Sequence, residues 1–141
     1  MRSATTACFV LIVLVDLSAV GCSKAEKATG PKTVPLRGKL AFTRGGDVKA
    51  LFNRQGRIEL ESVEQPGVRA MGPIEEDGSF VVATVTAEGS SPGAVPGTHR
   101  VRLDLDDAAE KLVAPQFLSY EKSGITVKVP SDQPLEIKVW K

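Results

Sequence analysis

Two kinds of side chain alternate strictly in HRVRLDLD, His99 to Asp106. Histidine and three aliphatic residues occupy the odd positions, and arginine and aspartate occupy the even positions. A period of two is typical of a β-strand with one buried and one solvated face. The stretch therefore predicts a half-buried strand of an antiparallel sheet.

The same period recurs on both sides of this stretch. It is found in LRGKLAF (36–42), RIELES (57–62), ITVKV (125–129) and LEIKV (135–139). SFVVATV (79–85) is apolar at nearly every position and predicts a more deeply buried strand. About seven short strands over residues 33–141 predict an all-β domain with the architecture of an antiparallel β-sandwich.

Turn-forming residues separate the expected strands. Asp77-Gly78 predicts a tight hairpin between IEE and SFVV, because a primed turn needs positive φ angles. The sequence from Asp107 to Glu110 matches a capping box and predicts one helical turn, capped by Asp107 and ended by Pro115.

Residues 1–21 have the pattern of an export signal. Arg2 supplies positive charge, and the apolar run ACFVLIVLV (7–15) is far shorter than the roughly 20 residues of a membrane-spanning helix. The run is followed by Ala19-Val20-Gly21 and then Cys22. Here the chain resembles a bacterial lipoprotein, which implies that the Cys22 thiol receives a diacylglyceryl group and that cleavage precedes it. The alternative is an ordinary secretory signal, cut near Gly21.

The cysteines favour the lipoprotein interpretation. Cys8 lies in the expected signal, so a chain that begins at Cys22 has no second thiol for an internal disulfide. Cys22 could then be lipidated, paired with another molecule, or free, and lipidation best explains its position. Segment 22–32 lacks apolar side chains larger than alanine and predicts a flexible tether. Together these features predict a domain (33–141) that is anchored to a bacterial membrane, with the outer membrane favoured, and that faces the periplasm or the exterior.

Several sequence segments of the expected domain also resemble those of a known family. RGKLAF, VRAMGPIEEDGSFVVAT, GAVPGTHRVRL and SGITVKVP are similar to segments of small lipoproteins abundant in Planctomycetes. The family carries a carboxypeptidase-regulatory-like, transthyretin-like sandwich and usually has tyrosine at the position of His99. The resemblance implies a fold and a location, and no activity.

Composition excludes some functions. The chain has 18 Lys and Arg against 17 Asp and Glu, which leaves no basic surface of the kind that nucleic acids need. No phosphate loop, metal-ligand spacing, nucleophile elbow or dinucleotide fingerprint is present, so we expect no cofactor and no catalytic residue.

Three features remain as candidates for chemistry. His99 is the only histidine in the sequence. Alternation places it on the other face of the strand from Asp104 and Asp106, which favours a packing role over that of a general base. Asp104, Asp106 and Asp107 form a weak candidate site for a hard cation such as Ca²⁺. Trp140 is in phase with exposed positions of its strand and is a candidate contact for a sugar or a protein.

These observations lead to one principal functional hypothesis and two alternatives. The principal one is a lipid-anchored, non-enzymatic structural or binding module of the cell envelope, whose partners are membrane lipid at Cys22 and an envelope protein or polysaccharide. The first alternative is a carbohydrate-binding accessory module with Trp140 as its platform. The second is a hydrolase that uses His99.

Overall fold

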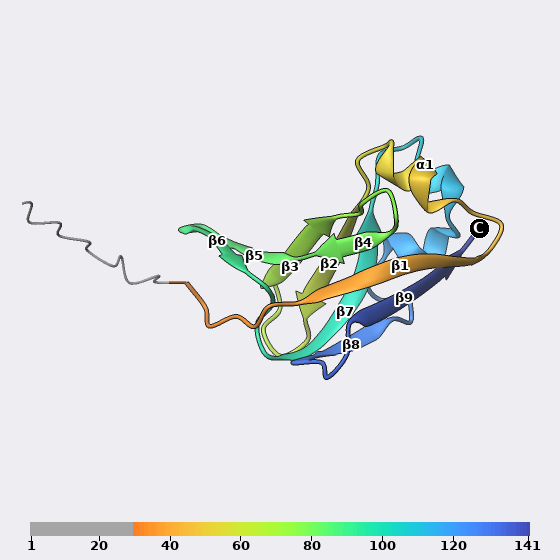
Figure 1. Cartoon of the computed structure of the whole chain (residues 1–141). Coiled ribbons are helices and arrows are strands. Elements are labelled where there is room, and N and C mark those ends of the chain that lie inside the picture. The colour runs from red at the N-terminus through yellow and green to blue at the C-terminus, as the bar shows by residue number, and fades with distance from the viewer. Residues whose placement is uncertain (1–29) are drawn as a thin grey trace, which may run out of the picture.

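Two facing β-sheets form the part of the chain that the computed structural model describes, residues 30–141 (Figure 1). The strands are β1 (Arg37–Arg44), β2 (Arg57–Ser62), β3 (Arg69–Pro73), β4 (Ser79–Val81), β5 (Ala83–Thr86), β6 (Gly89–Pro92), β7 (Gly97–Asp104), β8 (Thr126–Val129) and β9 (Leu135–Trp140). A short helix, α1 (Val48–Phe52), and two 3₁₀ helices, η1 (Glu110–Leu112) and η2 (Pro115–Leu118), lie between strands. The all-β sandwich predicted from the sequence is confirmed. The predicted signal peptide (1–21) and most of the predicted tether lie outside the described residues.

The two sheets differ in size and in strand direction. One has three strands in the order β4-β1-β9, and the other has six in the order β6-β5-β3-β2-β7-β8. All neighbours in the larger sheet are antiparallel. In the smaller sheet β1 pairs with β9 in parallel, which departs from the all-antiparallel prediction. Parallel neighbours need a crossover between them, and here the whole larger sheet separates β1 from β9 in the chain.

The prediction of one deeply buried strand at SFVVATV was wrong. The segment breaks at Val82 into β4, which pairs with β1, and β5, which pairs with β3. Its side chains still alternate, so Val81 and Val85 are 66% and 49% exposed while Phe80 is buried. The run is apolar at nearly every position because two of its outward positions also carry valine, and it carries the chain from one sheet to the other.

The turn at Asp77-Gly78 is present, but it does not join two strands of one ladder. Gly78 has a φ of 84°, and the Glu75 N–H donates to the Ser79 carbonyl at 2.8 Å. The strand before the turn, β3, belongs to the larger sheet, and the strand after it, β4, belongs to the smaller one. The predicted hairpin is therefore a corner between the two layers.

The core lies between the sheets and follows the predicted alternation. Along β7 the side chains of His99, Val101 and Leu103 are buried, and the arginines between them are only partly so. The largest fully buried aliphatic side chains are Leu40, Leu51, Ile58, Leu60, Ile74, Val82, Val101, Val129 and Ile137. Each contributes roughly 1.5–3 kcal/mol by its removal from water.

Helix α1 was not predicted. It begins after Asp47, whose carboxylate accepts the Lys49 N–H at 2.9 Å, and its Leu51 side chain is completely buried. The sequence nevertheless carries a signal for this helix, because aspartate is a favoured N-cap residue and the apolar Leu51 follows Asp47 by four positions.

The connection from β7 to β8 contains the helical turns, with a different cap from the one predicted. The Asp106 carboxylate, not that of Asp107, accepts the Ala109 N–H at 2.6 Å. Pro115 begins η2 and does not end η1, because proline suits the first position of a helix. Phe117 of η2 is buried in the core.

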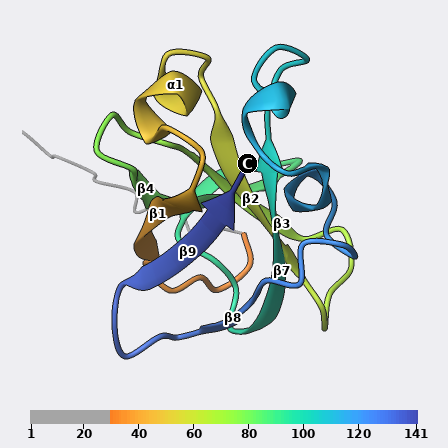
Figure 2. The same ribbon diagram turned by 90° about the vertical axis from the view of Figure 1, so that its right-hand side faces the viewer.

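The described chain starts and finishes at opposite ends of the sandwich (Figure 1). Near its start the Thr33 hydroxyl donates to the Pro92 carbonyl at 2.7 Å, and Val34 forms an antiparallel bridge with Ala94. The C-terminus, α1 and the 3₁₀ helices gather at the other end, which faces the viewer in Figure 2. We call this the distal end.

Candidate functional site

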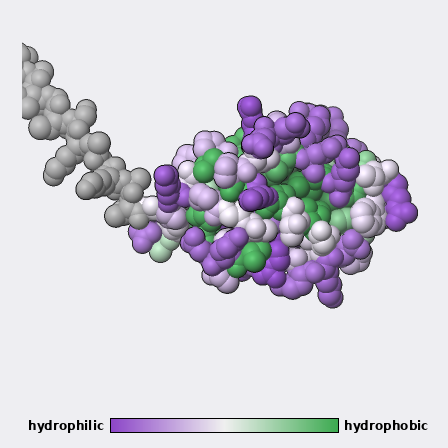
Figure 3. Space-filling model, turned by 90° about the horizontal axis from the view of Figure 1, so that it is seen from below, coloured by the Kyte–Doolittle hydropathy of each residue, from purple (hydrophilic) through white to green (hydrophobic). Residues whose placement is uncertain are grey.

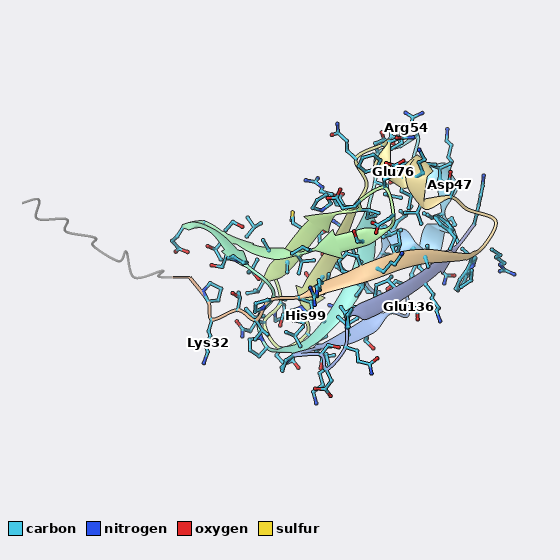
Figure 4. The ribbon with its side chains drawn as sticks, viewed as in Figure 1. Lys32, Asp47, Arg54, Glu76, His99 and Glu136 are labelled. Atoms are coloured by element: carbon cyan, nitrogen blue, oxygen red, sulfur yellow. The ribbon has the colours of Figure 1, made fainter. Side chains whose placement is uncertain are left out.

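Two grooves open at the distal end, on either side of the segment that follows β7. The larger, about 930 Å³, we call the α1 groove; it is lined by Phe52, Asn53, Arg54, Gln55, Gly56, Arg57, Pro73, Ile74, Glu75, Asp104, Leu105 and Asp106. The smaller, about 640 Å³, we call the Trp140 groove; it is lined by Arg44, Asp107, Glu110, Lys111, Val113, Ala114, Pro115, Leu118, Trp140 and Lys141. Figure 4 shows Asp47, Arg54 and Glu76 gathered at this end, far from Lys32 at the start of the described chain.

Trp140 does not face freely outward, as its place in the strand predicted. It is half-buried, with the edge of the Phe117 ring 4.7 Å away between centroids and at 83° to it. The Arg44 guanidinium lies over the indole at 5.6 Å, and the Trp140 carbonyl accepts the Ala114 N–H at 2.8 Å. Alternation along β9 could not reveal this, because the side chains that cover Trp140 come from β1 and from η2. Trp140 remains part of a groove wall.

The three aspartates at the end of β7 have separate contacts. Asp104 pairs with Arg57 at 2.7 Å, and Asp106 caps the turn that follows it. Asp107 lines the Trp140 groove. Within residues 30–141 no group of three or more His, Cys, Asp and Glu side chains could hold a metal ion.

His99 lies on the buried face of β7, as the alternation predicts, and it contacts a backbone carbonyl. It is 1% exposed, its Nε2 lies 2.8 Å from the Val95 carbonyl, and it stands opposite Ser62 in the β2–β7 ladder. Figure 4 shows it remote from Arg54 and Asp47 at the distal end. Without access to solvent it has no route to a substrate.

A cluster of ion pairs covers the outer face of the larger sheet, and sequence reasoning did not predict it. The buried Glu59 accepts from the Arg102 Nε at 2.6 Å, and Arg69 lies 3.7 Å from its other oxygen. Glu61, also buried, lies 3.1 Å from Arg100 and 3.5 Å from Arg69. The sequence could have indicated these ion pairs, because RIELES carries glutamate and HRVRLD carries arginine at their outward positions. Opposite charges at such positions pair when the two strands are neighbours.

Tyr120 lies over this cluster. The Arg102 and Arg69 guanidiniums lie 4.9 and 5.8 Å from the centre of its ring. Burial and the neighbouring Glu59 carboxylate raise the pKa of the Tyr120 hydroxyl far above its usual value. The phenol therefore stays neutral, and together with the ion pairs it holds the β7–β8 connection against the sheet.

Elsewhere the described surface is mixed. Seen from below, hydrophilic residues dominate and hydrophobic residues show in the middle of the face (Figure 3). The exposed large apolar side chains belong to separate segments of the chain: Phe52, Val63, Val81 and Val85. Single exposed apolar residues are usual on soluble domains. No helix among the described residues has the length and apolar character needed to cross a membrane.

The fold and its two distal grooves define an all-β sandwich with one candidate binding end. Comparison of the chain with family models, with curated proteins and with solved structures gives no match. The resemblance to the small lipoproteins of Planctomycetes therefore stays a prediction from sequence motifs.

Proposed function

We propose that this protein is a lipid-anchored, non-enzymatic binding module of the bacterial cell envelope. The anchor would be acyl groups on Cys22, and the polar segment that ends at Lys32 would separate the sandwich from the bilayer. The sandwich would then present its distal end to the periplasm or the exterior.

The observation that supports this proposal best is the placement of the grooves. Cys22 precedes the described chain by a few residues, and that chain enters the sandwich at the end opposite both grooves (Figure 1). A tether at one end leaves the grooves at the other end accessible. The burial of His99 gives no support to a hydrolase.

Metabolic labelling with radioactive palmitate in the native host tests the anchor. Wild type should be labelled and recovered with membranes, and Cys22→Ala should lose the label. Cys8→Ala is the matched control, because Cys8 lies within the segment that cleavage would remove. A membrane-bound wild type without label, or a Cys22→Ala variant labelled as strongly as wild type, contradicts the proposal.

A second candidate function is carbohydrate binding, and the Trp140 groove favours it. An aromatic wall beside carboxylates and cationic side chains provides both a flat apolar surface and hydrogen-bonding groups. Trp140 is the single tryptophan, so intrinsic fluorescence reports on this groove alone. Titration with a panel of oligosaccharides should shift or quench the emission, and an unchanged emission across the panel removes this support.

A further inference from the structure

The α1 groove is built by three segments that lie far apart in the sequence. Its walls are the end of α1 with residues 53–57, the segment 73–75 after β3, and residues 104–106 at the end of β7. Each segment leaves the sandwich at the distal end, so the groove is a product of the fold and has no linear motif.

Polar side chains on this groove have unused hydrogen-bonding capacity. Among residues 30–141, no ion pair includes Arg54 or Glu75, and the side-chain amides of Asn53 and Gln55 make no hydrogen bond, although their backbone N–H groups do. Phe52, on the last turn of α1, is 38% exposed beside them and offers part of an aromatic ring. An aromatic surface surrounded by free planar donors and acceptors is typical of a ligand site.

The backbone at Gln55 supports the same inference. Gln55 is the one described residue other than glycine with a positive φ, at 55°. It lies in the turn that follows α1, where the Gly56 N–H donates to the Leu51 carbonyl at 2.9 Å, and glycine is the usual residue at the left-handed position of such a turn. A side chain there destabilises the fold by about 1 kcal/mol, so a glutamine at this position points to a use for its amide.

The charges of the groove narrow the class of ligand. Two cationic side chains, Arg54 and Arg57, and three anionic ones, Glu75, Asp104 and Asp106, line the groove, and Arg57 pairs with Asp104. With two positive and three negative charges the lining is close to neutral, so it has no excess of positive charge for an anionic polymer. Hydroxyl groups both donate and accept hydrogen bonds, so a chain of vicinal hydroxyls can satisfy amides, guanidiniums and carboxylates together.

We infer that the α1 groove binds a neutral, hydroxyl-rich chain, that is, an uncharged glycan, with Phe52 against a sugar face and Gln55 and Arg54 on its hydroxyls. The inference rests on the proposed role as a binding module and does not depend on the anchor. If Cys22 carried no palmitate, the inference about the groove would be unaffected. If no glycan bound, the proposed lipid anchor would be unaffected.

Calorimetric titration of the full chain, purified in a detergent without sugar, tests this site. The probes are hexasaccharides of glucose, xylose and mannose, with a galacturonic acid hexamer as the charged comparison. At least one neutral probe should bind, and Phe52→Ala should weaken it about tenfold or more, as truncation of a buried aromatic contact does. Val85→Ala, which truncates a more exposed apolar side chain (49%) on β5 outside the groove, should bind as wild type does.

Gln55→Gly separates loss of binding from loss of folding. It removes the amide and relieves the positive φ, so the variant should melt at a higher temperature and yet bind the neutral probe more weakly. Undiminished affinity in Gln55→Gly and Phe52→Ala, tighter binding of the galacturonic acid hexamer, or no binding of any neutral probe overturns the inference.

Discussion

Replacement of Glu59 by glutamine tests whether the ion pairs on the outer face stabilise the sandwich. The Glu59 side chain is 4% exposed, and it lies 2.5 Å from Nη2 and 2.6 Å from Nε of Arg102. Glutamine keeps the size of the side chain and removes its charge. Arg102 and Arg69 then lose a carboxylate, although their side chains stay 31% and 46% exposed and can reach water.

The size of the effect follows from those contacts. A hydrogen bond to a charged group contributes about 1.5–3 kcal/mol, and loss of a partner deep in a protein costs about 3–5 kcal/mol. Because both arginines are partly solvated, we expect a loss near the lower end, about 2 kcal/mol. For a domain of this size that corresponds to a fall in Tm of about 8 °C.

Thermal and urea unfolding, followed by Trp140 fluorescence, provide the assay. Glu121→Gln is the matched control, because Glu121 lies 3.6 Å from Arg100 but its side chain is 68% exposed. The Glu121→Gln variant should lose less than about 0.5 kcal/mol of unfolding free energy, as is usual for exposed ion pairs. If Glu59→Gln melts within a degree of Glu121→Gln, the buried ion pairs do not stabilise the fold as argued.

Three further substitutions test the packing and the electrostatics. Gly72→Ala should destabilise by about 3 kcal/mol in urea unfolding, because a Cβ there would lie 1.9 Å from the Val81 carbonyl oxygen; near-wild-type stability would contradict the close approach of β3 and β4. Phe117→Ala should lower stability by about 3–5 kcal/mol and move the Trp140 emission to the red, since the indole loses its covering ring. Both Glu64 oxygens accept the Thr98 N–H at 3.0 Å, which lowers the Glu64 pKa below its ordinary value of 4.5. Its stabilisation is therefore present above that value and lost as the pH falls through the lowered pKa, so the difference in Tm between wild type and Glu64→Gln should be full at pH 7 and shrink near pH 3. A difference that is constant with pH would show that the carboxylate charge has no part in it.

Local patterns predicted the strands well where one face is buried and the other is charged. HRVRLDLD and LEIKV alternate in the structure as they do in the sequence, since each strand is solvated on one side. The prediction of one buried strand over SFVVATV failed because its outward positions carry Val81 and Val85. Periodicity alone also cannot identify the residue, Val82, at which the chain changes sheets.

Features that depend on distant contacts were beyond local reasoning. The parallel pairing of β1 with β9 leaves no trace in either strand, because a period of two is the same in both directions. Trp140 is covered by Phe117 and Arg44, and the α1 groove is formed by three segments that lie far apart in the sequence. Sequence reasoning therefore named Trp140 and Asp107 of the smaller groove and Asp104 and Asp106 of the larger one, but it did not predict a groove at either place.

Mass spectrometry of protein isolated from membranes of the native host tests the lipid anchor most directly. Trypsin cleaves after Lys24, so a mature chain that starts at Cys22 releases the short N-terminal peptide Cys-Ser-Lys. We predict that this peptide carries a diacylglyceryl group on its sulfur. The same peptide with a bare thiol, or a mature chain that starts at another residue, would contradict the anchor.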